Sequence, residues 1–247
     1  MALNKAGHGL HLLPNTSFNK IASSTKFHSL LKNDIGYNHP TIPQSMYIFK
    51  QPYIGSEVTS HQDCTFLHTS PRQTCIGFWF ALDDANLLNG CLWVRPKSFN
   101  EGLRRKFVRN IDYFKKKNGD NGSYDDDVPM LIFQNEPNAK KIPWEGKIPT
   151  TTTTDNNTNV IPTSLSYYKY LLKIGFIPIE CKAGDIVMFN GKVDHFSLPN
   201  YSNTQRHTFQ LHLIEGEDSD IFWDDDNWLQ YSDDNEDTTA SSFMKLY

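Results

Sequence analysis

The stretch Thr74-Cys75-Ile76-Gly77-Phe78-Trp79-Phe80-Ala81-Leu82 is the strongest strand signal in the chain. Aromatic and β-branched side chains dominate it, and such residues are enriched in β-strands. Turn-forming residues follow it at Asp83, Asp84, Asn86, Asn89 and Gly90. Another strand is predicted to begin at Cys91 and to continue to Val94. The centre of the chain therefore favours a structure built from short β-strands.

Strand patterns recur on both sides of this stretch. We expect them at Gln44–Gln51, Val58–Phe66, Phe176–Glu180, Ile186–Phe189, Val193–Phe196 and Thr208–Leu213. The pair Asn190-Gly191 predicts a tight hairpin. Many short strands with turns between them favour a closed or sandwiched antiparallel sheet. Helices are expected at Leu3–Leu13 and at about Asn19–Leu31, and Tyr167–Ile174 fits a short helix or the approach to a strand.

Length and composition are those of an ordinary globular protein. The chain has 247 residues, 38% of them apolar, and a formal net charge of −4, which suits one domain over residues 1–247. Mild acidity gives no bulk attraction to nucleic acid, and no apolar run is long enough to cross a membrane. Met1 to Leu13 does not resemble a signal peptide. We therefore expect a cytoplasmic monomer without nucleic-acid or membrane partners, and free thiols at Cys64, Cys75, Cys91 and Cys181.

Composition changes between about Arg104 and Ser164. This stretch contains Lys115-Lys116-Lys117, Asp125-Asp126-Asp127 and a threonine run from Thr150 to Thr154. Low complexity and few apolar residues predict a long, partly mobile insertion over residues 104–164. Its charge runs are most simply solvated surface.

The triplet His61-Gln62-Asp63 is the first candidate for chemistry. Side chains alternate along a strand, so His61 and Asp63 are expected on one face and Gln62 on the other. An imidazole and a carboxylate on one face make two-thirds of a facial iron site. We expect the third ligand to be His195, which lies in a later strand of the same β region.

A cation completes this arrangement. Arg206 begins a strand whose polar face carries Arg206, Thr208, Gln210 and His212. A polar inward face is unusual unless it lines a site. Arginine binds a carboxylate through two parallel hydrogen bonds, so Arg206 beside the metal centre suits a dicarboxylate co-substrate that chelates the metal with its other end.

Several segments resemble the phytanoyl-CoA dioxygenase family of Fe(II)- and 2-oxoglutarate-dependent oxygenases. They are Asn4-Lys5-Ala6-Gly7-His8-Gly9-Leu10-His11, Gln44-Ser45-Met46-Tyr47-Ile48-Phe49-Lys50-Gln51-Pro52, His61-Gln62-Asp63, Asn89-Gly90-Cys91-Leu92-Trp93, Gly184-Asp185 and Asn227-Trp228-Leu229-Gln230. The resemblance covers most of the chain except the insertion. It implies a mainly β, double-stranded β-helix fold (jelly roll, cupin-like) with flanking helices.

The resemblance also implies residue roles. His61, Asp63 and His195 would hold Fe(II), and Arg206 would bind the far carboxylate of 2-oxoglutarate. Lys5, Met46 and Trp79 fall where members of this branch contact the co-substrate. The implied reaction is a hydroxylase-type oxidation of a small molecule, coupled to conversion of 2-oxoglutarate and O2 to succinate and CO2. Phe78, Trp79, Phe80 and Trp93 are candidates for the wall of the pocket or for core.

The chain also departs from the family pattern. It lacks roughly the first third of a typical member, which predicts an N-terminally truncated form, and its insertion is longer than usual. Pro96-Lys97-Ser98-Phe99 stands where the family has Pro-Gly-Ser-His. Two other interpretations stay open: a protein that binds iron and 2-oxoglutarate without turnover, and a cupin-like protein with another metal. No residue pattern selects an acyl-CoA over another small substrate.

Overall fold

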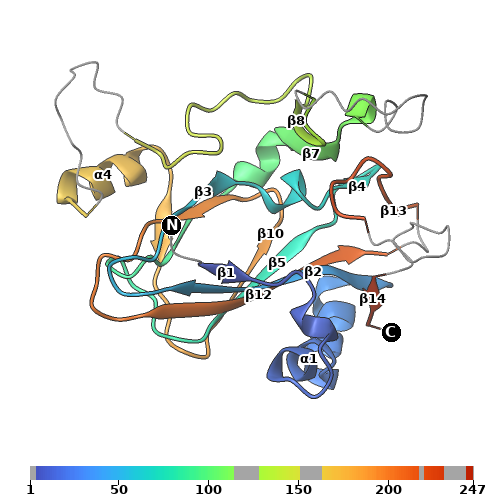
Figure 1. Cartoon of the computed structure of the whole chain (residues 1–247), viewed down its shortest axis with the longest axis horizontal. Coiled ribbons are helices and arrows are strands. Elements are labelled where there is room, and N and C mark those ends of the chain that lie inside the picture. Colours follow the sequence, from blue (N-terminus) through green and yellow to red (C-terminus); the bar gives the residue numbers. More distant parts are fainter. Residues whose placement is uncertain (1–3, 114–127, 151–162, 217–219, 231–242, 247) are drawn as a thin grey trace.

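Two antiparallel sheets carry the architecture of the computed structural model, which describes residues 4–113, 128–150, 163–216, 220–230 and 243–246 (Figure 1). The larger sheet has the order β1 (Lys5–Ala6), β2 (Pro40–Lys50), β12 (Arg206–Glu215), β5 (Ile76–Ala81), β10 (Ile186–Asn190), and β14 (Met244–Lys245) pairs with β2. The smaller sheet has the order β3 (Val58–His61), β11 (Asp194–Ser197), β6 (Leu92–Arg95), β9 (Ile177–Ile179). The mainly β, cupin-like fold expected from the sequence is confirmed.

Strand β5 is buried on both faces, which explains its nearly continuous apolar sequence. Phe78 and Phe80 pack on one side against Phe209 and Leu211 of β12, whereas Trp79 packs on the other side in a second cluster. Each buried aromatic side chain contributes about 1.5–3 kcal/mol through removal from water. The strand that dominates the sequence is therefore a central strand of the larger sheet.

The N-terminal prediction of a helix over Leu3–Leu13 was wrong. Lys5–Ala6 pair instead with Ile48 and Tyr47 at the edge of β2, and only Leu10–Leu12 form a short 3-10 helix, η1. Gly7 has φ 83°, in the left-handed region that favours glycine, so a helix cannot run through it.

The second predicted helix exists but is divided. Thr16 caps α1 (Ser17–Ala22) by accepting a hydrogen bond from the Asn19 N–H, and Ser24 caps α2 (Thr25–Ser29) in the same way. A π-helical turn, η2 (Leu30–Ile35), continues α2. These helices supply Ala22, Phe27 and Leu31 to the core against the larger sheet. None of the described helices is long and apolar enough to cross a bilayer.

The predicted hairpin at Asn190-Gly191 was also wrong, because this turn joins the two sheets. Strand β10 pairs with β5, whereas β11 pairs with β3 and β6. Gly191 donates to the Cys75 carbonyl at 2.7 Å and accepts from the Cys64 N–H at 2.9 Å. A Cβ atom at Gly191 would lie 2.8 Å from both Cys64 Sγ and the Cys75 backbone oxygen, so the crossing needs glycine.

Part of the stretch 104–164 has regular structure. Strands β7 (Arg105–Arg109) and β8 (Leu131–Asn135) pair with each other, and Ser60 of β3 exchanges backbone hydrogen bonds with Gly146 and Lys147. The lysine run 115–117, the aspartate run 125–127 and the threonines 151–154 lie outside the described residues. After this stretch, α4 (Leu165–Lys173) settles the ambiguous segment as a helix.

The remaining described elements are short. Strands β4 (Thr69–Ser70) and β13 (Phe222–Trp223) pair with each other. Two 3-10 helices, η3 (Asp63–Thr65) and η4 (Ser98–Glu101), follow β3 and β6. Of these, η3 matters most for the site because Asp63 begins it.

Candidate functional site

His61 and His195 face each other across two paired strands. They are register partners in the β3–β11 ladder, and their ring centroids lie 4.3 Å apart. Asp63 follows one extended residue later, because Gln62 keeps φ −110° and ψ 134°. The Gln62 amide points elsewhere and donates to the Gly102 and Lys192 carbonyls. The alternation expected from the sequence therefore places His61 and Asp63 on one side.

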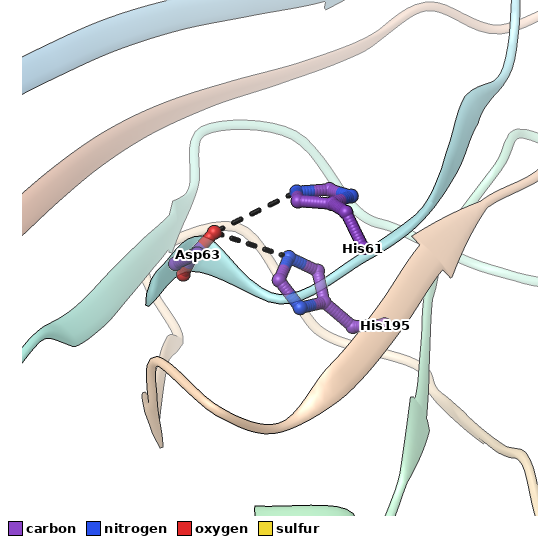
Figure 2. A group of neighbouring side chains, drawn as sticks. All are labelled: His61, Asp63 and His195. Carbon is purple, nitrogen blue, oxygen red and sulfur yellow. Dashed lines mark ion pairs between the residues drawn. The ribbon is translucent and has the colours of Figure 1, made fainter. Parts of the chain in front are cut away.

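The three side chains converge on one point (Figure 2). Asp63 Oδ1 lies 3.6 Å from His61 Nε2 and 3.6 Å from His195 Nε2. Donor atoms bonded to one transition-metal ion at about 2.0–2.2 Å lie roughly 3–3.6 Å from one another. The group therefore has the spacing of three ligands that share an ion.

Backbone contacts fix the orientation of both imidazoles. Nδ1 of His61 lies 2.7 Å from the Thr59 carbonyl, and Nδ1 of His195 lies 3.0 Å from the Val193 carbonyl. A carbonyl only accepts, so each Nδ1 carries the proton and each Nε2 presents a lone pair to the centre.

Burial and neighbouring charges set the protonation of these three side chains. Burial and the nearby His61 lower the pKa of His195 to about 4, so its ring is neutral at pH 7. Burial alone would raise the pKa of Asp63, but His212 and His195 hold it well below its usual value. The carboxylate is therefore ionised. In His61 burial opposes the effect of Asp63, whose carboxylate raises the pKa of that ring.

His212 supports the second oxygen of Asp63. Its Nε2 lies 3.5 Å from Asp63 Oδ2, and the residue is buried. Gly77 leaves space beside this oxygen, because a Cβ there would lie 2.7 Å from Oδ2. The alternation along this strand predicts His212 on the face of Arg206 but predicts no role for it. An even spacing from Arg206 along one strand was the available signal.

Arg206 is a buried cation on the same face of β12. It is 1% exposed, and burial lowers its pKa to about 10, so it stays charged at pH 7. Nη1 donates to Thr208 Oγ1 at 3.1 Å, and the guanidinium carbon lies 5.5 Å from the centroid of the Trp79 ring. Among the described residues Arg206 forms no salt bridge, and its Nε has no hydrogen-bond partner. Such a group is suited to an anionic ligand.

One cavity of about 610 Å³ connects these residues. His61, Asp63, His195, Arg206 and His212 line it, together with Lys5, Met46 and Trp79. Met46 and Trp79 flank Gln210 from the two neighbouring strands, and Lys5 lies at the edge on β1. The structure thus brings all seven residues selected from the sequence to one cavity. Phe78 and Phe80 belong to the core instead.

A buried ionic cluster holds the strand that carries His195. Asp194 is fully buried and lies 3.2 Å from both Arg95 Nε and Arg104 Nη2. Trp144 Nε1 also donates to this carboxylate at 3.1 Å. Arg104 and Trp144 both come from the stretch 104–164, so part of that stretch supports the site. This role could not be predicted from the sequence, because Arg95, Arg104 and Trp144 all lie far from Asp194 along the chain.

A second group of possible metal-binding side chains lies near the C-terminal segment. His68 Nε2 lies 3.6 Å from Asp224 Oδ2 and 3.4 Å from Asp226 Oδ1. Lys106 Nζ lies 3.0 Å from the same Asp224 oxygen. The Lys106 ammonium group thus already supplies the positive charge at these carboxylates. These ion pairs connect residues 224–226 to β7.

Comparison with known proteins gives consistent matches. The family model for phytanoyl-CoA dioxygenase (PhyH) matches residues 3–208. An Arabidopsis thaliana protein described as phytanoyl-CoA dioxygenase is 36% identical over 231 residues, covering 93% of this chain and 62% of the relative. A Dictyostelium discoideum homolog of phytanoyl-CoA dioxygenase domain-containing protein 1 is 36% identical over 230 residues, with coverages of 93% and 65%. The chain thus spans less than two-thirds of the length of these relatives.

Solved structures share the fold at low sequence identity. The non-heme alpha-ketoglutarate-dependent carbocyclase SnoK aligns with a TM-score of 0.54 and 12% identity, covering 89% of this chain and 64% of that one. EctD from S. alaskensis, solved with 2-oxoglutarate and 5-hydroxyectoine, aligns with a TM-score of 0.52 and 15% identity, covering 85% and 56%. These likenesses support the sheet architecture described above.

Proposed function

The chain belongs to the phytanoyl-CoA dioxygenase family, and from that premise we propose that it is an Fe(II)- and 2-oxoglutarate-dependent dioxygenase that oxidises a small molecule. The observation that carries this proposal is a single cavity that holds both a possible metal group and a buried arginine, which pairs with no carboxylate among the described residues. The His–Asp group alone is also explained by structural ion pairs. The combination of this group and the arginine suits a dicarboxylate that bridges metal and guanidinium.

The donor set fits iron. Two neutral imidazole nitrogens and one carboxylate oxygen on one side of an ion form the facial arrangement of non-heme iron oxygenases and leave other positions open. His61, Asp63 and His195 would hold the ion. When bound, iron would supply oxidation of a substrate C–H bond, coupled to conversion of 2-oxoglutarate and O2 to succinate and CO2. The protein residues set geometry, charge and access around it.

Arg206 would orient the co-substrate. Its guanidinium binds the carboxylate distant from the metal, and Thr208 and Trp79 limit the rotation of the arginine side chain. Met46 and Trp79 wall this end of the cavity, and Lys5 adds a cation at its edge. The apolar walls keep bulk water from the ionic contact and strengthen it.

The test is succinate release from 2-oxoglutarate in the presence of Fe(II) and O2, with and without a metabolite extract. Wild-type protein is expected to release succinate, and His195→Ala is expected to abolish the release. Arg206→Met is expected to raise the 2-oxoglutarate concentration needed for half-maximal rate by about tenfold or more, since a charged hydrogen-bonded pair is lost. His28→Ala, a change in α2 outside the cavity, serves as the matched control.

Two results would change the proposal. If anaerobic Fe(II) and 2-oxoglutarate give a visible charge-transfer band but no extract supports succinate release, the protein binds both without turnover. If metal analysis of protein purified without oxygen finds a different ion, and Fe(II) does not replace it, the dioxygenase proposal is wrong.

A further inference from the structure

The cavity has a second end, beside Gln44 and His212, that is lined by aromatic rings. Trp228 packs against the His8 ring, which hydrogen-bonds with Gln44, the register partner of His212. Phe66, Phe107, Phe133 and Trp228, here called the aromatic wall, all line the cavity. The ring centroids of Phe107 and Phe133 lie 4.7 Å apart, those of Phe66 and Phe107 5.6 Å, and those of Phe107 and Trp228 6.0 Å. The rings therefore form one continuous surface.

The aromatic wall begins at the metal group. Phe66 directly follows η3, and its ring centroid lies 6.0 Å from that of His61. Phe107 and Phe133 come from opposite positions on β7 and β8. A molecule that rests on these rings would therefore also reach the space beside His61.

The four rings are held in place before any ligand binds. Trp228 Nε1 donates to the Phe66 carbonyl at 2.8 Å, which satisfies the only polar atom of that side chain. Two residues earlier, the Asp224–Asp226 segment is fastened to β7 by Lys106 and to His68. A preassembled surface binds with a smaller loss of conformational entropy.

This surface is not a closed core. Phe133 is 47% exposed, and Phe66, Phe107 and Trp228 are only partly buried. Apolar surface left open in a cavity is unfavourable until a ligand covers it. The cavity of about 610 Å³ is within the range of roughly 300–1,000 Å³ seen for small-molecule sites, so it has room for a co-substrate and a small substrate.

The positive charge of the arginine beside the aromatic wall is balanced by a nearby glutamate. Arg105 lies over the Phe133 ring, 3.9 Å from its centroid, but its Nε lies 3.2 Å from Glu145 Oε1. Arg104 pairs with the same glutamate. A substrate anion at this end would have to compete with Glu145 for Arg105, so the surface favours an uncharged group.

We propose that the aromatic wall binds a flat, uncharged ring of the substrate, so that the molecule oxidised at the metal group is a ring-bearing one and not a straight-chain acyl compound. This inference rests on the proposed function for its oxidative part. The binding part can be measured without turnover. Ring-on-ring contact strengthens binding by about twofold to tenfold beyond that of an aliphatic group of equal area.

The experiment compares 2-naphthol with decahydro-2-naphthol and 1-decanol as probes. Binding to the full chain, loaded with Zn(II) and 2-oxoglutarate, is measured by calorimetry or saturation-transfer NMR. We expect 2-naphthol to bind about twofold to tenfold more tightly than decahydro-2-naphthol, which has the same carbon skeleton, and also more tightly than 1-decanol. Phe133→Leu, which keeps an apolar side chain but removes the most exposed of the four rings, is expected to reduce this preference. Phe107→Leu is expected to weaken it.

Phe99→Leu is the matched control, since Phe99 is exposed and outside the cavity lining. Equal binding of the three probes, or an unchanged preference in Phe133→Leu, would overturn the proposal. Tighter binding of 1-decanol would point to a chain-like substrate, and tighter binding of 2-naphthoate would contradict the uncharged ring. If the protein releases succinate but does not prefer 2-naphthol, only the proposal of a ring-binding surface is wrong. Ring preference without any succinate release would defeat the proposed function alone.

Discussion

The carboxylate of Asp63 is held from two sides, and one of them offers a direct test. Oδ1 faces the two ligand histidines, whereas Oδ2 faces His212 Nε2 at 3.5 Å. His212→Ala leaves Oδ2 buried without support, so we expect Mn(II) affinity to fall by about 10–100-fold. Calorimetric titration with Mn(II) measures this.

Two further variants test whether a loss of Mn(II) affinity comes from the missing contact with Asp63 Oδ2 or only from lost packing. His212→Gln retains a donor that can reach Oδ2 and is expected to restore part of the affinity. His207→Ala, on the opposite face of β12, is expected to leave it unchanged. Equal Mn(II) affinity in wild type and His212→Ala would show that His212 does not support the carboxylate.

His11 makes stability depend on pH. Burial lowers its pKa to about 4 from 6.5, so the unfolded chain binds more protons between these values. The stabilising contribution is therefore complete above about pH 6.5 and is lost as the pH falls toward 4. His11→Asn keeps a polar atom near Ser45 Oγ but does not titrate.

Urea unfolding of wild type and His11→Asn at pH 7 and pH 4.5 measures this contribution. We expect the wild type to lose on the order of 1–3 kcal/mol more free energy of unfolding than the variant over this range. Parallel pH profiles would show that His11 does not titrate upon unfolding.

At the scale of the secondary-structure elements, the contact between Arg104 and Asp194 connects the residue before β7 to the first residue of β11. Arg104→Met removes one of two guanidinium groups beside a fully buried carboxylate, and we expect the free energy of unfolding to fall by about 3 kcal/mol. Lys140→Met removes an exposed partner of Glu101 and is expected to cost less than about 1 kcal/mol. Urea denaturation compares the two, and similar losses would contradict a central role for Arg104.

Strand prediction succeeded where side-chain pattern decides the structure and failed at boundaries set by distant contacts. Gln44–Gln51 was found, but β2 begins earlier, at Pro40. Pro43 lacks an N–H, and the β2–β12 register shifts beside it, between His212 and Ile214. The strand accommodates proline through this irregularity, which the sequence does not reveal.

The residues of the candidate site were easiest to predict where the relevant pattern lies within a few neighbouring residues of the sequence. His61 and Asp63 are neighbours in sequence, and Arg206 has an alternating polar face. His195 needed the long-range pairing of β11 with β3. The aromatic wall could not be predicted, because its rings come from four separate segments and each of them alone resembles core.

For the molecule as a whole, a bound ion is expected to raise thermal stability. Mn(II) at 100 times its Kd adds about 2.7 kcal/mol if only the folded chain binds it. For a chain of this size each kcal/mol raises Tm by about 2–4 °C, so the expected rise is roughly 5–10 °C. Differential scanning fluorimetry with and without a chelator measures it, and Asp63→Asn should remove most of the effect. A rise of equal size in that variant would indicate binding elsewhere.

The double attachment of residues 104–147 has an evolutionary consequence. Arg104 is tied to Asp194, and Gly146 is tied to Ser60 beside the metal group. Doubling the length of a loop between fixed ends costs only about 0.6 kcal/mol. Over evolution, insertions and deletions between these anchors that spare Trp144 and Glu145 therefore cost little. They alter the cavity wall, whereas His61, Asp63 and His195 lie outside this segment.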